Sequence, residues 1–201
     1  MKTKFNDVFL EGVLVDLVIL NEEVAKNSDW YSWFNYKKNT ELLQLGKFPN
    51  TKEKQLEYFK KSIVKKKNLK KKIPENQKIQ LGIVIKKRKE LIGMVTLLDF
   101  DYFNRSCGIS LIMDLRKKID ERLLVFKESQ DLMINHAFFE MNLRRIYTTS
   151  FSDQLCKMTE RVFGFKREGI LREHQFLNGK YVDSFVLGLL RSEWKNRIDK
   201  K

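Results

Sequence analysis

The feature that most constrains the fold is one long amphipathic helix pattern that lies between β-rich runs. In the segment 123–143, apolar residues recur at alternating spacings of four and three, the period of an α-helix with one buried face. The stripe consists of Val125, Ser129, Leu132, His136, Phe139 and Leu143, with Phe126, Met133 and Ala137 beside it. A mixed α and β domain is the architecture in which such a helix covers a sheet.

The β-rich runs lie on both sides of this helix. The runs 78–86 and 91–100 are separated by a short charged turn, which is typical of a hairpin, and a third run covers 107–113. After the helix, Asn178-Gly179 is the strongest short hairpin signal in the chain. With one strand near the N-terminus and one after residue 143, the sequence predicts an α+β fold with a central, mixed but mostly antiparallel sheet of about seven strands flanked by helices.

Shorter helices are marked by start and stop signals. The segment 28–38 places aromatic residues at helical spacing behind a Ser-Asp pair. Asn50 followed by Glu53 has the form of a capping box. A third helix is expected to open at Asp153 and to end at Gly164.

Length and composition indicate one domain over residues 1–201, with no internal repeat. The N-terminal apolar tract is interrupted by Glu11 and Asp16, so we expect neither a signal peptide nor a membrane span. The two cysteines, Cys107 and Cys156, form no CxxC pair and have no nearby histidine. This favours reduced thiols in a cytoplasmic protein and argues against a metal site.

The net charge of +14 is unevenly distributed. Eight lysines fall within residues 60–72, and this run is expected to form a solvated lysine-rich loop at about 60–76. Attraction of a polyanion is the alternative reading, but no aromatic residues interleave the lysines to support base stacking. Nucleic-acid binding therefore rests on charge alone, and we do not favour it.

Four segments resemble the GCN5-related N-acetyltransferase (GNAT) superfamily, in the branch of ribosomal-protein N-terminal and related amine acetyltransferases. The four segments occur in the same order along the chain as the corresponding motifs of the family. The ending "GFKREGILREHQFLNGKYVDSFVLGLL" is the most specific of them. The segments are 33–59, 91–113, 134–147 and 162–190.

This resemblance implies an acyltransferase that uses acetyl-CoA as co-substrate. It implies a V-shaped cleft where the family's fourth and fifth strands splay apart, with the fourth-strand backbone, here Leu111, Ile112 and Met113, holding the pantetheine arm and polarising the thioester. The acceptor is a small-molecule or peptide amine that attacks directly. Metal and membrane are not implied, and the resemblance is compatible with a monomer or a homodimer.

The junction that follows this strand departs from the family pattern. The family's loop reads R/Q-x-x-G-x-G/A and cradles a pyrophosphate on backbone amides, whereas residues 114–126 here contain no glycine and seven of the nine residues 114–122 are charged. Two alternatives remain. The cations Arg116, Lys117, Lys118 and Arg122 clamp phosphates through their side chains, or the ordinary CoA site is lost or weakened and the protein is a non-catalytic binding module.

The short helix carries further candidates. Asp153 and Cys156 stand where this branch has Asn-x-x-Ser, and Glu160 stands where the wider superfamily has a tyrosine acid. The resemblance places this flank against the thioester, where Cys156 would protonate the leaving thiolate. The alternatives are a small buried thiol and, for Asp153, a helix cap.

Candidates for a general base are Asp99 and Asp101, in the turn between two strands, and Glu173 and His174, on a strand beside the cleft. Each also reads as an ordinary turn or exposed strand residue. The aromatic residues Trp30, Trp33 and Tyr36 are expected to wall the acceptor pocket, although core packing explains the tryptophans equally well.

Overall fold

The computed structural model describes residues 7–41, 48–61, 78–118 and 122–199. Of the lysine-rich loop expected at 60–76, only Lys60 and Lys61 lie within these residues. The strands are β1 (Val8–Glu11), β2 (Val15–Ile19), β3 (Ile79–Ile85), β4 (Glu90–Asp101), β5 (Ser106–Met113), β6 (Arg145–Ser150), β7 (Lys166–Leu177) and β8 (Lys180–Leu190). The helices are α1 (Glu22–Asn27), α2 (Trp30–Trp33), α3 (Lys37–Thr40), α4 (Lys52–Phe59), α5 (Arg122–Asn135), the π-helical segment η3 (His136–Glu140), α6 (Asp153–Phe163) and α7 (Arg191–Ile198).

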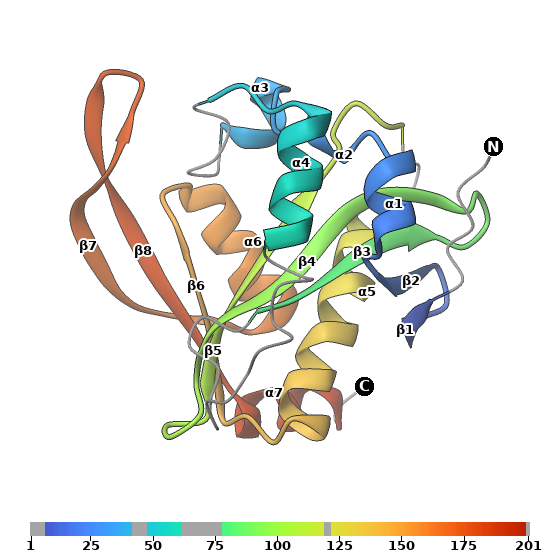
Figure 1. The fold of residues 1–201 in the computed structure, drawn as a ribbon. Coiled ribbons are helices and arrows are strands. Elements are labelled where there is room, and N and C mark those ends of the chain that lie inside the picture. Colours follow the sequence, from blue (N-terminus) through green and yellow to red (C-terminus); the bar gives the residue numbers. More distant parts are fainter. Residues whose placement is uncertain (1–6, 42–47, 62–77, 119–121, 200–201) are drawn as a thin grey trace.

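One eight-stranded sheet organises the molecule, in the order β1-β2-β3-β4-β5-β6-β8-β7 (Figure 1). β5 and β6 are parallel, whereas the other paired strands among the described residues are antiparallel. The predicted α+β class is confirmed. The strand count is higher than expected because the N-terminal run folds into two strands, β1 and β2, joined by a turn at Gly12.

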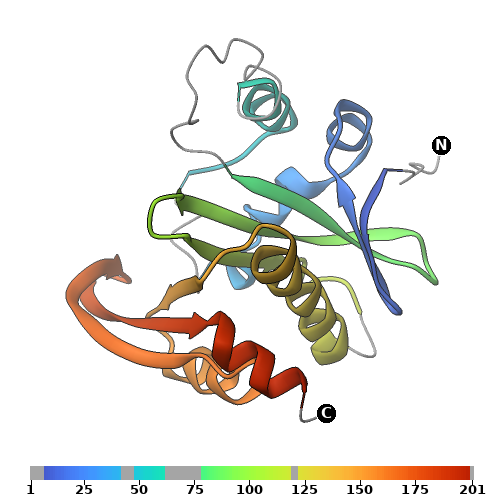
Figure 2. The same ribbon diagram turned by 90° about the horizontal axis from the view of Figure 1, so that it is seen from below.

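Helices cover both faces of this sheet, as Figure 2 shows. One face packs against α5 and α6 in a core that includes Ile83, Val95 and Met133. The other packs against α1, α2 and α4. Strand residues alternate between the two cores with the period of two that a pleated strand imposes.

The long helix differs from its predicted pattern near its C-terminal end. Residues 122–135 are α-helical, but the next turn is π-helical over His136–Glu140. The extra residue in this turn rotates the buried stripe, so Phe138 is fully buried and Phe139 is 37% exposed. His136, expected on the buried stripe, packs edge-on against the Phe9 ring, and partial burial lowers the pKa of its imidazole.

Two predicted caps fall one residue from their observed positions. Thr51, and not Asn50, accepts from the Lys54 amide at 3.2 Å and opens α4. Ser152, and not Asp153, caps α6 by accepting from the Leu155 amide at 3.3 Å. The C-terminal helix α7 was not expected from the sequence.

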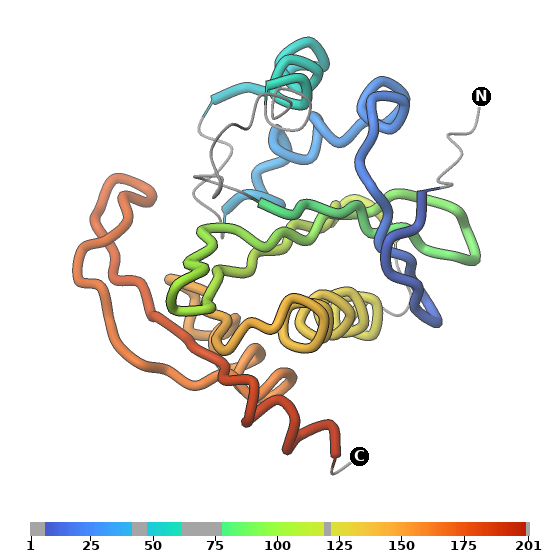
Figure 3. Tube along the Cα trace, turned by 60° about the horizontal axis from the view of Figure 1, so that its bottom comes forward, coloured from blue at the N-terminus to red at the C-terminus, as the bar shows by residue number. Residues whose placement is uncertain are grey.

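The predicted stop at Gly164 is confirmed. This glycine has φ +82°, the left-handed conformation in which an added Cβ is unfavourable, and its amide donates to Glu160 O at 2.9 Å. The Asn178-Gly179 turn is also confirmed, with φ of +49° and +84°. It joins β7 and β8 into an arm that curves away from the rest of the sheet (Figure 3).

Candidate active site

A cleft opens where the two parallel strands of the sheet separate. β5 and β6 pair only over Ser106–Gly108 and Arg145–Tyr147, and beyond these residues no ladder pairs them. The rest of β5, Ile109–Met113, and the rest of β6, Thr148–Ser150, therefore form the two walls of a V. Two strands that part within one sheet leave backbone edges that are free to bind a ligand.

The amides of β5 that face the cleft follow from its register. Asp114 N–H donates to Ile92 O on β4 at 2.8 Å. Because amides alternate between the two edges of a strand, Ile112 also faces β4, whereas Met113 and Leu111 direct their N–H groups to the opposite edge. Two of the three backbone positions expected to hold a ligand therefore face the cleft through their amides.

The cleft has a volume of about 510 Å³, within the range of small-molecule binding sites. Its lining residues come from β5, β6, α3, α5, α6 and β8, and most are apolar. They are Lys38, Asn39, Ile109, Ser110, Leu111, Ile112, Met113, Leu115, Arg122, Leu123, Phe126, Gln130, Thr148, Thr149, Ser150, Leu155, Cys156, Met158, Thr159 and Leu187. None of these residues carries a carboxylate or an imidazole, and the two charged ones are Lys38 and Arg122.

Cys156 is the thiol among the side chains that line the cleft. It lies on α6, is 1% exposed, and its Sγ is 3.9 Å from the carbonyl oxygen of Ser150 on β6. Burial raises the pKa of the Cys156 thiol, so the group is neutral at physiological pH and retains a proton to donate. Of the α6 flank predicted to face the cleft, Cys156 is the member that lines it.

The two acids of that flank are paired with a cation and do not line the cleft. Arg167 Nη2 lies 2.7 Å from Asp153 Oδ1, and Arg167 Nε donates to Glu160 Oε1 at 2.9 Å. Lys157 also pairs with Asp153 at 2.7 Å, and hydrogen bonds from Lys157 and Arg167 lower the pKa of this carboxyl. Asp153 is therefore held as a structural carboxylate on the outer side of α6.

The charged junction after β5 is organised around a buried carboxylate. Asp114 is fully buried, and its two oxygens accept from Arg116 Nε and Nη2, both at 2.8 Å. Asn39 donates to Asp114 at 3.4 Å and accepts from the Leu115 amide at 2.8 Å. Burial opposes ionisation of Asp114, but the hydrogen bonds from Arg116 outweigh it and lower the pKa of the carboxyl.

The cations that we expected to clamp a phosphate make other contacts within the protein. Arg116 Nη2 also donates to Ser32 Oγ at 2.8 Å, and Lys117 Nζ lies 2.9 Å from Glu90. Lys118 contributes its carbonyl oxygen, which accepts from Arg88 Nη2 at 2.8 Å. Of the four expected cations, Arg122 is the one whose side chain lines the cleft.

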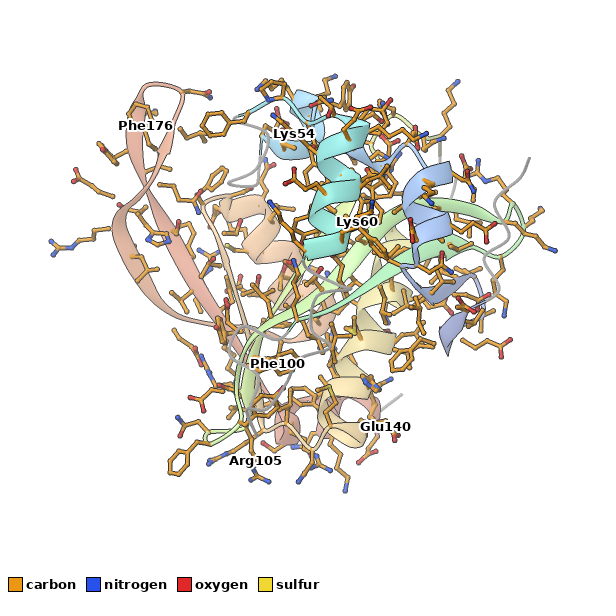
Figure 4. The ribbon with its side chains drawn as sticks, in the orientation of Figure 1. Lys54, Lys60, Phe100, Arg105, Glu140 and Phe176 are labelled. Carbon is orange, nitrogen blue, oxygen red and sulfur yellow. The ribbon has the colours of Figure 1, made fainter. Side chains whose placement is uncertain are left out.

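The predicted general bases lie away from the cleft walls. Asp99 is exposed at an irregularity of β4, with φ +51°, and is part of the strand and not of a turn. It precedes Phe100, which lies toward the Arg105 turn in Figure 4. Glu173 and His174 lie on the β7–β8 arm, whose tip is marked by Phe176 in Figure 4, and line a separate shallow hollow with Asp183.

The aromatic residues expected to wall an acceptor pocket divide into two groups. Trp30 and Trp33 are 2% and 0% exposed and belong to the core between the sheet and α1, α2 and α4. Tyr36 is partly exposed, and its ring lies 6.0 Å from the Arg116 guanidinium carbon. The two indoles therefore pack in the interior, and Tyr36 is the one at the surface.

Several lining residues were not expected from the sequence. Lys38 on α3 carried no sequence signal, and Thr148, Thr149 and Ser150 looked like ordinary strand residues. Gln130 did carry a sequence signal, because it is a polar residue one helical turn from Phe126 on a face that is otherwise apolar.

Metal-ligand clusters and membrane-spanning helices are both absent from the described part of the chain. No group of three or more His, Cys, Asp or Glu side chains there could hold a metal ion. No helix within residues 7–41, 48–61, 78–118 and 122–199 is both long enough and apolar enough to cross a membrane.

Comparison with known proteins gives relatives in sequence. Spermidine N(1)-acetyltransferase of Vibrio cholerae is 29% identical over 115 residues, which cover 56% of this chain and 64% of that protein. The SPbeta prophage-derived uncharacterized N-acetyltransferase YokL of Bacillus subtilis is 28% identical over 118 residues, 56% of this chain and 63% of that protein. The match thus spans less than two thirds of the length of either relative. No family profile matches the chain.

Solved structures are similar over nearly the whole chain. Spermidine N-acetyltransferase from Vibrio cholerae in complex with CoA and spermine has a TM-score of 0.71 at 21% identity, covering 91% of this chain and 99% of that one. A GNAT-family acetyltransferase from Bacillus anthracis has a TM-score of 0.69 at 14% identity, covering 92% and 99%. At these identities the likeness establishes a shared fold.

Proposed function

The chain has the fold of the GNAT superfamily, as its sequence motifs indicated, and from this premise we propose that it transfers an acetyl or related acyl group from acyl-CoA to a primary amine. The observation that carries the proposal is the β5–β6 cleft, which combines apolar walls, free strand amides and a neutral thiol. The substrate class is a peptide N-terminus, an amino sugar or another small amine.

The residues present fit an acyl-CoA arm. Leu111 and Met113 offer amides along the wall of β5, and apolar side chains such as Phe126 and Leu155 line a channel suited to a flexible, largely uncharged arm. Bound there, acyl-CoA supplies an activated thioester carbonyl. Amides that point at its carbonyl oxygen stabilise the negative charge that develops when a nucleophile adds.

The transfer then requires two proton movements. The neutral amine attacks the carbonyl carbon, a C–N bond forms, and the C–S bond breaks to release a thiolate. Cys156 donates its Sγ proton to the thiolate, which leaves as the thiol, and the cysteine regains a proton from solvent. The nitrogen loses its extra proton to water, because no carboxylate or imidazole is among the described residues that line the cleft.

The proposal is tested by following thiol release from acetyl-CoA with a panel of primary amines, alongside calorimetric titration with acetyl-CoA and CoA. We expect saturable binding and amine-dependent thiol release. Thr149→Trp, which places an indole in the cleft, should abolish both, whereas Tyr181→Trp places an indole at a 65% exposed position on the arm and should preserve both. Absence of binding up to millimolar ligand would contradict the proposal.

A second candidate is a non-catalytic GNAT-fold protein that uses this cleft or its surface to bind a partner. It is favoured by the junction after β5, where glycines are absent and Arg116 and Lys117 are paired within the protein. CoA binding without thiol release for any amine in the panel would support it.

A further inference from the structure

We infer that the cleft recognises its acyl carrier through three side chains, Lys38, Arg122 and Gln130, which together do what a glycine loop does elsewhere. The ligand chemistry is an anionic phosphate end joined to an amide-bearing arm. The inference rests on the proposed function, because it concerns the same cleft, and it identifies residues that neither the fold nor the relatives assign.

Gln130 is an unpartnered polar group inside the cleft. Its side chain lines the cavity and the residue is only 8% exposed, yet it makes no hydrogen bond within the described part of the structure. Neither Oε1 nor Nε2 of Gln130 is among the fully buried atoms without a partner, so the carboxamide is reached from the cleft. It offers both a donor and an acceptor to the cleft, the complement of a ligand amide.

Arg122 is a half-satisfied cation that lines the cleft. Its Nη2 donates to the carbonyl oxygen of Lys117, which fixes the guanidinium plane. Its Nη1 is buried and has no hydrogen-bond partner among the described residues. A guanidinium that lines the cleft and keeps N–H groups unpaired within the described structure is suited to a phosphate oxygen.

Lys38 lines the same cleft from a different element. It is an exposed residue of α3, and its neighbour Asn39 accepts a hydrogen bond from the Leu115 amide at 2.8 Å. α3 is thereby fixed to the junction that also holds Arg122 through Lys117. Two cations from separate elements thus line one cleft.

The spacing of these groups matches one extended ligand. Arg122 and Gln130 are eight residues apart on α5, which is about 12 Å along the helix axis. An anion at Arg122 and an amide at Gln130 therefore fit along the length of one arm, in the cleft that Cys156 also lines. The neighbouring cations Arg116 and Lys117 are already engaged by Asp114 and Glu90.

The experiment is a titration of the full chain with CoA and with pantetheine, which has the amides and lacks the phosphates. Arg122→Gln should raise the Kd for CoA about 10- to 100-fold and Lys38→Gln about 3- to 10-fold, with the Kd for pantetheine changed by less than about twofold in both. Gln130→Met should raise both Kd values by about 2- to 10-fold.

A second readout separates a binding role from a structural one. Gln130→Met replaces an unpaired carboxamide with an apolar chain of similar length, so the ligand-free variant should melt at a higher temperature than the wild type. Lys127→Met, on the same helix but paired with Asp131, is the matched control and should leave both Kd values unchanged.

The outcomes are distinguishable. If the wild type binds neither CoA nor pantetheine, the proposed function is itself contradicted. If the wild type binds CoA and the three variants bind both probes as it does, the cleft holds its ligand by other groups and only the present inference is overturned. If the Gln130→Met protein has a lower melting temperature than the wild type and binds CoA normally, Gln130 has a structural role. That result would contradict its proposed role in ligand binding.

Discussion

The walls of the cleft and the charged junction after β5 present polar groups in different ways. Along the walls, β5 supplies backbone amides and Cys156 supplies a neutral thiol. The junction 114–118 is charged but pairs most of its charges internally, around Asp114. The difference shows that a high density of cations near a site does not measure how many are available to a ligand.

The largest effect is expected at the centre of the junction network. Asp114→Ala leaves Arg116 and Asn39 without their shared buried acceptor, and should lower the free energy of unfolding by about 2–4 kcal/mol. Urea unfolding measures this. Glu22→Ala, which removes an exposed pair with Lys26, is the control and should change it by less than about 0.5 kcal/mol. Equal effects of the two substitutions would show that the network contributes no more than a surface pair.

The same carboxyl predicts a pH dependence of stability. The pKa of Asp114 is lowered in the folded protein, so its stabilising contribution is fully present above the unfolded value of about 4 and is lost as pH falls through the folded value. The wild type should therefore lose stability below about pH 4 more steeply than Asp114→Asn. Thermal melts across pH 3–6 compare them, and parallel curves would show that Asp114 titrates normally.

In the cleft, Cys156→Ala should lower kcat about 10²-fold by removing the proton donor to the thiolate, with little change in the KM for acetyl-CoA. Cys107→Ala is the matched control, because Cys107 is equally buried in the same core but does not line the cleft, and burial raises the pKa of its thiol to about 12. It should lower stability and leave kcat near that of the wild type. A Cys156→Ala enzyme with the kcat of the wild type would show that solvent, and not Cys156, supplies the proton to the leaving thiolate.

No acid or imidazole is among the described residues that line the cleft, and this predicts how the rate depends on pH. Because the amine must arrive neutral, kcat/KM should rise about tenfold per pH unit and level off near the pKa of the amine used. Amines of different pKa should shift the plateau accordingly. An inflection at the same pH for every amine would instead indicate a protein base.

The smallest effect is expected for the paired cation of the junction. Lys117→Ala should weaken CoA binding by no more than about twofold and lower stability by less than about 1 kcal/mol, because Lys117 already pairs with the partly exposed Glu90. Titration calorimetry of this variant beside Arg122→Gln gives the comparison directly. A loss as large as that of Arg122→Gln would mean that the Glu90 pair opens for the ligand.

Local patterns predicted most of the fold. The hairpin at Asn178-Gly179, the stop at Gly164 and the strands around residues 86–90 were all expected from residues close in sequence. The stripe of α5 was predicted until His136, where the π-helical turn exchanges Phe139 for Phe138 in the core. Nothing in the local period of apolar residues indicates such a turn, because it is fixed by what the helix packs against.

The candidate site was predicted less completely. Leu111, Met113, Arg122 and Cys156 were identified and line the cleft, whereas Glu173 and His174 were placed beside it and lie on the arm. A strand residue's sequence position does not tell how far the strand curves away from its neighbours. The outward curvature of β7 and β8, visible in Figure 3, decides this.

The sequence by itself determined the α+β class, the order of the elements and the unusual charge of residues 114–122, because these depend on spacing and composition. Only the tertiary structure decided which charges remain for a ligand. Asp114 and Glu90 engage Arg116 and Lys117, while Arg122, Lys38 and Gln130 face the cleft from α5 and α3. The physical reason is that ion pairs and buried amides are satisfied by partners distant in the chain, whose positions exist only once the sheet has folded.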